Sequence, residues 1–378
     1  MVSKGLKMEN KILLVFTGGT IGSITKNHII NVDSSARYHL LEKYEKRTGR
    51  NRAIFDVYEP FSLLSENLVP ADWVSLVDSI KTKSLDKYSG IIVTHGTDTL
   101  PYTSAVLSYI FNGLDIPLVV VASNLPLDAP ESNGLNNFIA AVNFIEDVAT
   151  PGTFVIYQND MGENIVHLGT RLTEAFPFTH QFRSQKDAYF GKIVDGKFAR
   201  NDSSPYGPSV SELLDRKVFT YEKLSFSDQI LSIKPYPGLN YELFDFSVAR
   251  PRAVLHALYH SGTACMRPST EDKNKYSMLD FARRCRAENI DFYVAPLSAA
   301  SDTLYATSEE FLNYKVIPML DMTMEAAIAK LSLAYGSFRD RKTIIEFLKR
   351  DIFFELISAN RAINNLKLVG ERHAENKS

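Results

Sequence analysis

Two glycine-bracketed threonine motifs follow apolar runs and could carry chemistry. The first, TGGTIG at 17–22, follows ILLVF at 12–16, and the second, HGTDT at 95–99, follows IIVT at 91–94. Each apolar run predicts a buried parallel strand that ends in a tight turn. In open α/β sheets ligands bind at the carboxyl ends of such strands, so two threonine hydroxyls there would point into one crevice. The motifs therefore favour covalent catalysis by a hydroxyl nucleophile.

Thr20 is the residue that we expect to attack the substrate. A threonine hydroxyl is weak at its free pKa, so it needs a base and an oxyanion site. Glycines such as Gly19 and Gly96 let backbone N–H groups approach a substrate closely. Taken alone, the first motif leaves open a turn that only packs or that cradles a phosphate.

Together, in this order and spacing, the two motifs resemble the bacterial-type L-asparaginase/glutaminase family, cytoplasmic type. A third stretch, DMTMEA at 321–326, is similar to the family's carboxy-terminal D-M-T-x-E-A segment. The resemblance implies an amidohydrolase without cofactors, in which Thr97 positions or activates the attacking group and Asp98 binds the substrate α-amino group. A charge-assisted hydrogen bond would suit that amino group. The residues alone leave a second role open, because Asp98 could cap the helix expected to begin near Tyr102.

Three further substrate contacts follow from the same resemblance. Ser65 aligns with a serine that binds the α-carboxylate, and Glu66 with a residue that binds the α-amino group. Ser123 aligns with a position that offers a backbone carbonyl to the substrate amide. The segment at 65–67 could otherwise be an ordinary polar connection.

The sequence departs from the family at a catalytic position. The family places a lysine in a G-x-R-x-x-K pattern, whereas the matching stretch here, GTRLTE at 169–174, ends in Glu174. If Glu174 and Asp98 share a site, one pKa rises strongly and the two carboxyls titrate as a coupled pair. A protonated Glu174 could donate a hydrogen bond, but it could not lower the pKa of a threonine as an ammonium does.

Two other family positions are also replaced. Ile29 aligns with the tyrosine that closes over the substrate, with His28 beside it, and Tyr38 lies too far along the chain. His28 could serve as a base at neutral pH or could simply be solvated. The run HSGTA at 260–264 replaces the family's G-x-G-N string, so no asparagine from a neighbouring subunit is expected.

The surrounding elements predict two α/β domains. Strands and helices alternate in the first half, which favours a parallel, helix-covered sheet with right-handed crossovers. We expect a larger N-terminal parallel-sheet domain at 10–196, a linker at 197–227 and a smaller C-terminal α/β domain at 228–372. The strands expected in addition to the two above lie at 118–122, 153–157, 230–235, 254–259, 292–295 and 316–318, and the helices at 71–88, 102–112, 133–147, 278–288, 324–335 and 341–357.

Composition excludes several classes of protein. The 378 residues include 42 basic and 44 acidic ones, so no basic surface for nucleic acid is expected. No stretch approaches the ~20 apolar residues of a membrane span, and the polar start at 1–10 favours the cytoplasm. Cys265 and Cys285 are expected to be small core residues, and no Cys/His cluster has metal-ligand spacing.

We therefore expect an amidohydrolase that forms an acyl-enzyme with a substrate other than free asparagine. A slow L-asparaginase and a non-catalytic relative that binds an amino acid remain alternatives. The resemblance implies a homodimer or homotetramer. A subunit of an RNA-linked amidotransferase is disfavoured by the lack of an appended N-terminal domain and of a basic stripe.

Overall fold

The computed structural model describes residues 11–357 except 27–28, 33–35, 268–274, 299–304 and 315. These residues fall into two compact units that meet in sequence at Phe219 and Thr220. Residues 197–219, which we expected in a linker, belong to the first unit. Residues 197–200 form its last strand, so the unit extends beyond the boundary that turn-forming residues had indicated.

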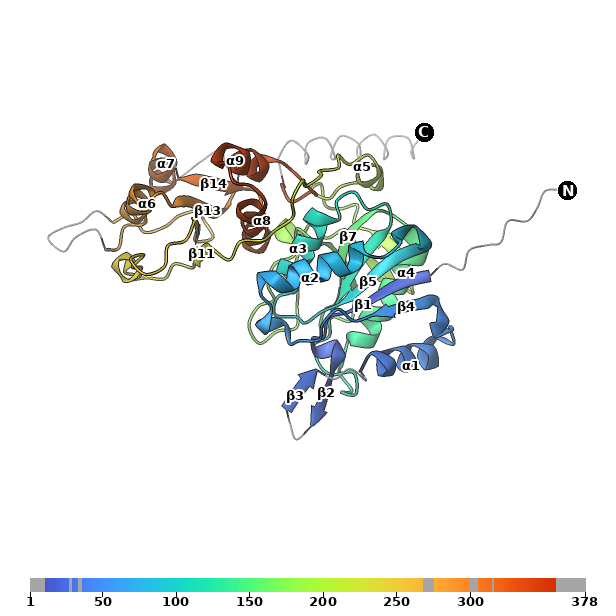
Figure 1. The fold of residues 1–378 in the computed structure, drawn as a ribbon. Helices are drawn as coiled ribbons and strands as arrows, with labels where there is room; N and C mark the ends of the chain where they lie inside the picture. Colours follow the sequence, from blue (N-terminus) through green and yellow to red (C-terminus); the bar gives the residue numbers. More distant parts are fainter. Residues whose placement is uncertain are drawn as a thin grey trace. The chain divides into compact units, whose positions relative to one another are not determined.

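The first unit is built on a mixed sheet, which Figure 1 shows in blue to green. In the described residues the strand order is β10-β9-β8-β7-β6-β5-β1-β4. The strands β4, β1, β5, β6 and β7 pair in parallel, and β8 to β10 add an antiparallel edge. Their bounds are β1 (Lys11–Phe16), β4 (Phe55–Tyr58), β5 (Tyr88–Thr94), β6 (Pro117–Val121), β7 (Gly152–Gln158), β8 (Asn164–Leu168), β9 (Gly191–Val194) and β10 (Lys197–Arg200).

Continuous apolar runs formed the central strands as expected. Strands covered on both faces lose the alternation of polar and apolar residues, and β6, with the sequence PLVVV, is buried at every position. By contrast, β10 alternates exposed and half-buried residues, as an edge strand does. The sequence pattern did not reveal β4, β8 or β9.

Four helices cover this sheet: α1 (Ala36–Thr48), α2 (Pro70–Lys81), α3 (Leu100–Ile110) and α4 (Gly134–Val148). The α2 and α3 helices pack together, and Trp73 Nε1 donates a hydrogen bond of 3.0 Å to Thr103 Oγ1. The α1 and α4 helices form a second pair, in which the rings of Tyr44 and Phe138 meet edge to face at 5.5 Å. Each pair occupies one face of the sheet (Figure 1).

The crossover connections of this sheet do not all have the expected right hand. The crossovers from β5 to β6 through α3 and from β6 to β7 through α4 run in the same direction along the sheet. Because α3 and α4 lie on opposite faces, the two crossovers have opposite hands. Our expectation of uniformly right-handed connections is therefore wrong, although that hand dominates in parallel sheets.

Helix ends also differ from the expected ones. The α2 helix begins at Pro70, one residue before the expected start, but it ends at Lys81 and a separate 3-10 turn follows at Leu85–Lys87. Thr99 is the N-cap of α3, so the helix begins before Tyr102 and Asp98 does not cap it. A hairpin of β2 (Ser23–Lys26) and β3 (Ile29–Val32) and the short helix α5 (Val210–Leu214) were not predicted.

The second unit holds a smaller parallel sheet in the order β11-β12-β13-β14. Its core packs aromatic rings, such as Tyr241 stacked on Phe281, between the sheet and α6. Cys285 lies in this core as expected, but Cys265 is exposed. The elements are β11 (Ile230–Ile233), β12 (Ala253–Ala257), β13 (Asp291–Leu297), β14 (Ile317–Leu320), α6 (Met278–Ala287), α7 (Ala306–Asn313), α8 (Met324–Ser337) and α9 (Arg341–Lys349).

The strands of this unit match the predicted ones apart from shifted ends. The α9 helix is shorter than expected, because it ends at Lys349 rather than near Ile357, and α7 was not predicted. In the part of the chain that the structure describes, no helix is long and apolar enough to cross a membrane.

Candidate active site

The loop after β1 carries the first motif and bends sharply. Gly18 and Gly19 have φ angles of 96° and 71°, in the left-handed region that favours glycine. The Gly19 amide donates to the Leu63 carbonyl at 2.9 Å, and the Thr17 hydroxyl donates to the Thr94 carbonyl at 2.7 Å. Thr20 then begins a 3-10 turn and is half-buried. The nucleophile predicted from sequence thus sits on a loop that is tied to two other segments.

Three strand-end loops contact one another through their backbones. A Cβ atom on Gly19 would lie 2.3 Å from the Gly96 nitrogen, and one on Gly96 would lie 2.3 Å from Ser65 Oγ. The Thr99 hydroxyl donates to the Ser65 carbonyl at 3.0 Å. Since these distances leave no room for a side chain, the loops that carry Thr20, Ser65 and the second motif meet at one place.

Ser65 has an unusual environment for a buried hydroxyl. The residue is 3% exposed, and in the described residues Ser65 Oγ has no hydrogen-bond partner. Leaving a buried polar group unpaired costs about 1–3 kcal/mol, so such a group calls for an explanation. A bound ligand at the meeting point of the loops would satisfy it.

His95 begins the second motif but is unsuited to act as a base. It is buried, and its Nδ1 lies 2.8 Å from the Gly96 carbonyl, which fixes Nδ1 as the donor. Burial lowers the His95 pKa to about 4, so the ring is neutral at pH 7. Its role is to hold the turn that presents Thr97 and Asp98.

Carboxyl groups gather beside Thr97. Burial raises the pKa of Asp98, and the negative charge of Glu66 raises it further. We expected Glu174 to be the charge that acts on Asp98, and Glu66 is the neighbour that raises its pKa. Glu174 is exposed, and its Oε1 accepts a hydrogen bond from the Tyr102 hydroxyl on α3.

Asp98 and Glu174 nevertheless line the same cavity, which has a volume of about 420 Å³. Its walls include Thr97 and the segment 174–180, with His180. The sequence reasoning missed Tyr102 and His180, because neither belongs to a motif. The nearest signal was the position of Tyr102 in the helix directly after HGTDT.

The other predicted residues have different surroundings. The Ser123 side chain is buried and donates to the Leu125 carbonyl at 2.5 Å, so it holds its own loop. His28 lies outside the described residues, and so does the side chain of Ile29. Tyr38 lies in α1, where Arg37 donates a hydrogen bond of 3.4 Å to its hydroxyl.

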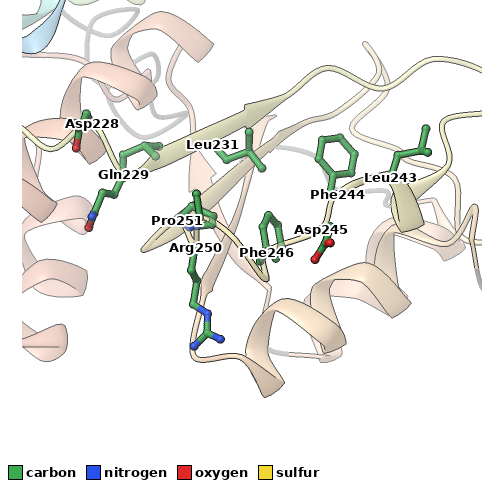
Figure 2. A pocket seen from close by; sticks show the side chains of 11 residues that line it. Asp228, Gln229, Leu231, Leu243, Phe244, Asp245, Phe246, Arg250 and Pro251 are labelled. Atoms are coloured by element: carbon green, nitrogen blue, oxygen red, sulfur yellow. The ribbon is translucent and has the colours of Figure 1, made fainter.

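The second unit contains the third motif and a larger cavity. Thr323, in DMTMEA, is the N-cap of α8 and accepts a hydrogen bond from the Ala326 amide at 3.0 Å, which is a structural role. Figure 2 shows side chains that line this cavity of about 580 Å³ beside β11, among them Phe244, Phe246 and Arg250. None of the described residues that line it is a predicted site residue.

In the described residues no group of three His, Cys, Asp or Glu side chains could hold a metal ion.

Replacing Gly19 by alanine should separate the three loops. Alanine at φ 71° is strained by about 1–2 kcal/mol, and its Cβ would clash with the Gly96 backbone. Because a misplacement of about 1 Å can cost a factor of about 100 in rate, we expect kcat/KM for an amide substrate to fall about 100-fold. Steady-state assays of Gly19→Ala measure this.

Gly22→Ala is the matched control in the same loop. A Cβ atom on Gly22 would meet nothing within 4 Å, and its φ is not in the left-handed region. The control should therefore keep its rate within about twofold. If kcat/KM falls equally in Gly19→Ala and Gly22→Ala, the close contact between Gly19 and Gly96 is not what positions the catalytic loops.

Comparisons with known proteins give a family match and similar relatives that span most of this chain. A family model described as "Asparaginase, N-terminal" matches residues 11–205. An L-asparaginase from Thermococcus kodakarensis is 27% identical over 351 residues, which cover 92% of this chain and 99% of that protein. A subunit of the glutamyl-tRNA(Gln) amidotransferase from Aeropyrum pernix is 24% identical over 363 residues, which cover 92% of this chain and 80% of that protein.

Solved structures show the same fold. The thermostable L-asparaginase from Thermococcus kodakarensis superposes with a TM-score of 0.73 at 24% identity, covering 92% of this chain and 100% of that one. L-asparaginase I from Vibrio cholerae also gives a TM-score of 0.73 at 22% identity. That match covers 92% of this chain and 99% of the Vibrio cholerae chain.

Proposed function

Because this chain belongs to the asparaginase family and is therefore a hydrolase of amide carbon–nitrogen bonds, we propose that Thr20 is its nucleophile. The Thr20 hydroxyl oxygen attacks the carbonyl carbon of a side-chain carboxamide, and the carbon–nitrogen bond breaks as the nitrogen takes up a proton. Water then hydrolyses the acyl-enzyme, which releases the acid and restores the hydroxyl. The substrate is an amino-acid-like amide other than free asparagine.

The observation that carries this proposal is the contact between the three loops. The close approach of Gly19 to Gly96, and of Gly96 to Ser65, brings the Thr20 loop next to residues suited to bind an amino acid. The unpaired Ser65 hydroxyl can donate to a carboxylate. Asp98 and Glu66, whose charges interact, can accept hydrogen bonds from an ammonium group.

The proposal is tested by ammonia and amine release from asparagine, glutamine and a set of larger amides. We expect turnover of at least one amide by the wild-type protein, with the best substrate larger than asparagine. A folded protein that is silent on every amide, yet is stabilised by an amino acid in thermal unfolding, would instead be a binding protein.

Ser65→Ala should weaken substrate binding without lowering the stability of the fold. Because the hydroxyl is unpaired in the described structure, its loss should leave the free energy of unfolding unchanged or slightly improved. Because a hydrogen bond to a charged group is lost from the complex, KM should rise about 10- to 100-fold. Chemical denaturation and steady-state kinetics measure the two effects.

Ser79→Ala is the matched control. Ser79 is also buried, but its hydroxyl donates to the Leu76 carbonyl at 2.7 Å. This variant should lose about 1 kcal/mol of stability and keep its KM. An unchanged KM in Ser65→Ala would remove Ser65 from the substrate site.

The similarity to the Aeropyrum pernix protein supports a second candidate. In this alternative the chain is one component of an amidotransferase that acts on glutamyl-tRNA(Gln). Glutamine hydrolysis that is negligible in the isolated protein and rises at least about tenfold with a partner protein would favour it. Full turnover by the isolated chain would favour the simple amidohydrolase.

A further inference from the structure

The cavity beside Thr97 and Asp98 is larger than one side-chain amide requires. Its volume of about 420 Å³ falls in the range of sites that bind whole small molecules. Thr97 belongs to the motif that we place at the scissile amide, and it lines the cavity directly. A group attached to the amide nitrogen could therefore extend into this space.

The charge of the cavity is negative. Asp98 and Glu174 both line it, and none of the lining residues in the described part of the chain is lysine or arginine. His180 is the one lining side chain there that could carry a positive charge. The hydrogen bond from the Tyr102 hydroxyl fixes the Glu174 carboxylate in position. Because Asp98 is assigned to the substrate α-ammonium, the Glu174 carboxylate is the partner that a cationic group on the amide nitrogen would gain.

Aromatic side chains complete the walls. Phe176, Phe178 and Phe182 line the cavity, and Phe178 is fully exposed with φ 62°. A bulky residue in this conformation is rare, and such strain clusters at functional sites. The Arg183 guanidinium, which does not line the cavity, lies 5.6 Å from the Phe176 ring centroid, so this ring can pack against a cation.

A buried hydroxyl also lines this cavity. Tyr157 is fully buried, and in the described residues its hydroxyl, although near Asn133, makes no hydrogen bond of normal geometry. Burial raises the Tyr157 pKa to about 12, so the hydroxyl stays protonated at pH 7. Its oxygen can accept a hydrogen bond from an ammonium group.

We propose that the cavity selects amides whose nitrogen carries a cationic alkyl group, so that the leaving group is a charged amine. This deepens the function proposed above and rests on it. Thr20 Oγ attacks the carbonyl carbon, the carbon–nitrogen bond breaks, and the amine leaves after taking a proton. Water then hydrolyses the ester, so one amide and one water give one acid and one amine.

The test compares four amides of the same amino acid. The asparagine side-chain nitrogen carries an aminobutyl group, a pentyl group of similar length, a carboxypropyl group or no substituent. We expect the wild-type protein to favour the aminobutyl over the pentyl amide by about 10- to 100-fold in kcat/KM. A ratio near one, with at least one of the four amides turned over, overturns the inference and leaves the proposed amidohydrolase function standing.

Variants of Glu174 assign the selectivity. Glu174→Gln should lower the preference for the aminobutyl amide about tenfold, and Glu174→Lys should reverse it in favour of the carboxypropyl amide. Glu163→Gln removes a carboxylate from the surface of the same unit, where it pairs with Lys192, and should keep the wild-type ratio. A ratio that does not respond to either Glu174 variant, in folded protein, would also overturn the inference.

Different results reject the amidohydrolase function and the preference for a cationic leaving group. If no amide turns over in the folded wild-type protein, the proposed function is rejected, and the inference that rests on it is rejected as well. If at least one amide turns over but charge on the nitrogen substituent makes no difference, only the inference is rejected.

Discussion

Replacement of Thr20 by alanine is expected to lower kcat/KM for the best amide by at least about 1,000-fold. The hydroxyl oxygen forms the acyl bond in the proposed mechanism, and loss of a covalent nucleophile is among the largest single effects in enzymes. Thr20→Ser keeps a hydroxyl and should retain measurable turnover. Ammonia or amine release by the wild type and both variants, measured side by side, gives the result.

The fold should survive this change. Thr20 is half-buried on a loop, so removal of its hydroxyl and methyl groups should cost well under about 1 kcal/mol. Thr48→Ala removes the same atoms from α1, where the hydroxyl bonds the Tyr44 carbonyl, and should keep full activity. Undiminished turnover in Thr20→Ala would mean that another residue attacks the amide.

The second large effect concerns stability, in a part of the molecule that holds none of the proposed site residues. Replacing Lys330 by methionine is expected to destabilise the second unit by about 3–5 kcal/mol. Lys330 and Glu355 are both completely buried, and Lys330 Nζ lies 2.5 Å from Glu355 Oε1. The variant would leave the Glu355 carboxylate in an apolar interior without its cation. Thermal or chemical unfolding measures the loss.

The structure explains why this pair is present. Glu355 also accepts hydrogen bonds from the Ile352 amide at 3.0 Å and the Phe353 amide at 2.7 Å, and Lys330 donates to the Arg350 carbonyl. The pair thereby fastens the segment after α9 to α8. Burial raises the pKa of Glu355, but Lys330 and the two amides outweigh it, and the pKa lies below its ordinary value.

Because the pKa of Glu355 is lowered, the stability of the second unit should depend on pH. A carboxyl with a lowered pKa stabilises the fold at pH values above its unfolded pKa of about 4.3, and this stabilisation is lost as pH falls further.

Lys192→Met is the control for Lys330→Met. It breaks the exposed pair with Glu163 and should cost at most about 1 kcal/mol of stability. The double variant Lys330→Met, Glu355→Gln should recover part of the loss, because no charge is then buried. Equal stability of Lys330→Met and Lys192→Met would contradict the expected role of burial.

Much of the central sheet was predictable from the sequence, and for a simple reason. A parallel strand that is covered on both faces must be apolar at nearly every position, and the sequence displays this in ILLVF, IIVT and LVVV. The antiparallel strands β9 and β10 have four residues each and are partly exposed, so their residues satisfy weaker constraints. The β8 strand is buried, but Asn164 and His167 interrupt its apolar run. The opposite hand of the β6–β7 crossover leaves no local pattern in the residues at all.

The amino-acid sequence was sufficient to indicate the family and the residue types of the candidate site. The two threonine motifs and their order carried that information, because a tight turn against another backbone restricts residues such as Gly19 and Gly96 to glycine. The partner of a charged or polar group depends on distance in space. Three such pairs became visible only in the folded chain: Glu66 with Asp98, Tyr102 with Glu174, and Lys330 with Glu355. Each pair is brought together by the path of the chain between elements, and no local periodicity in the sequence indicates it.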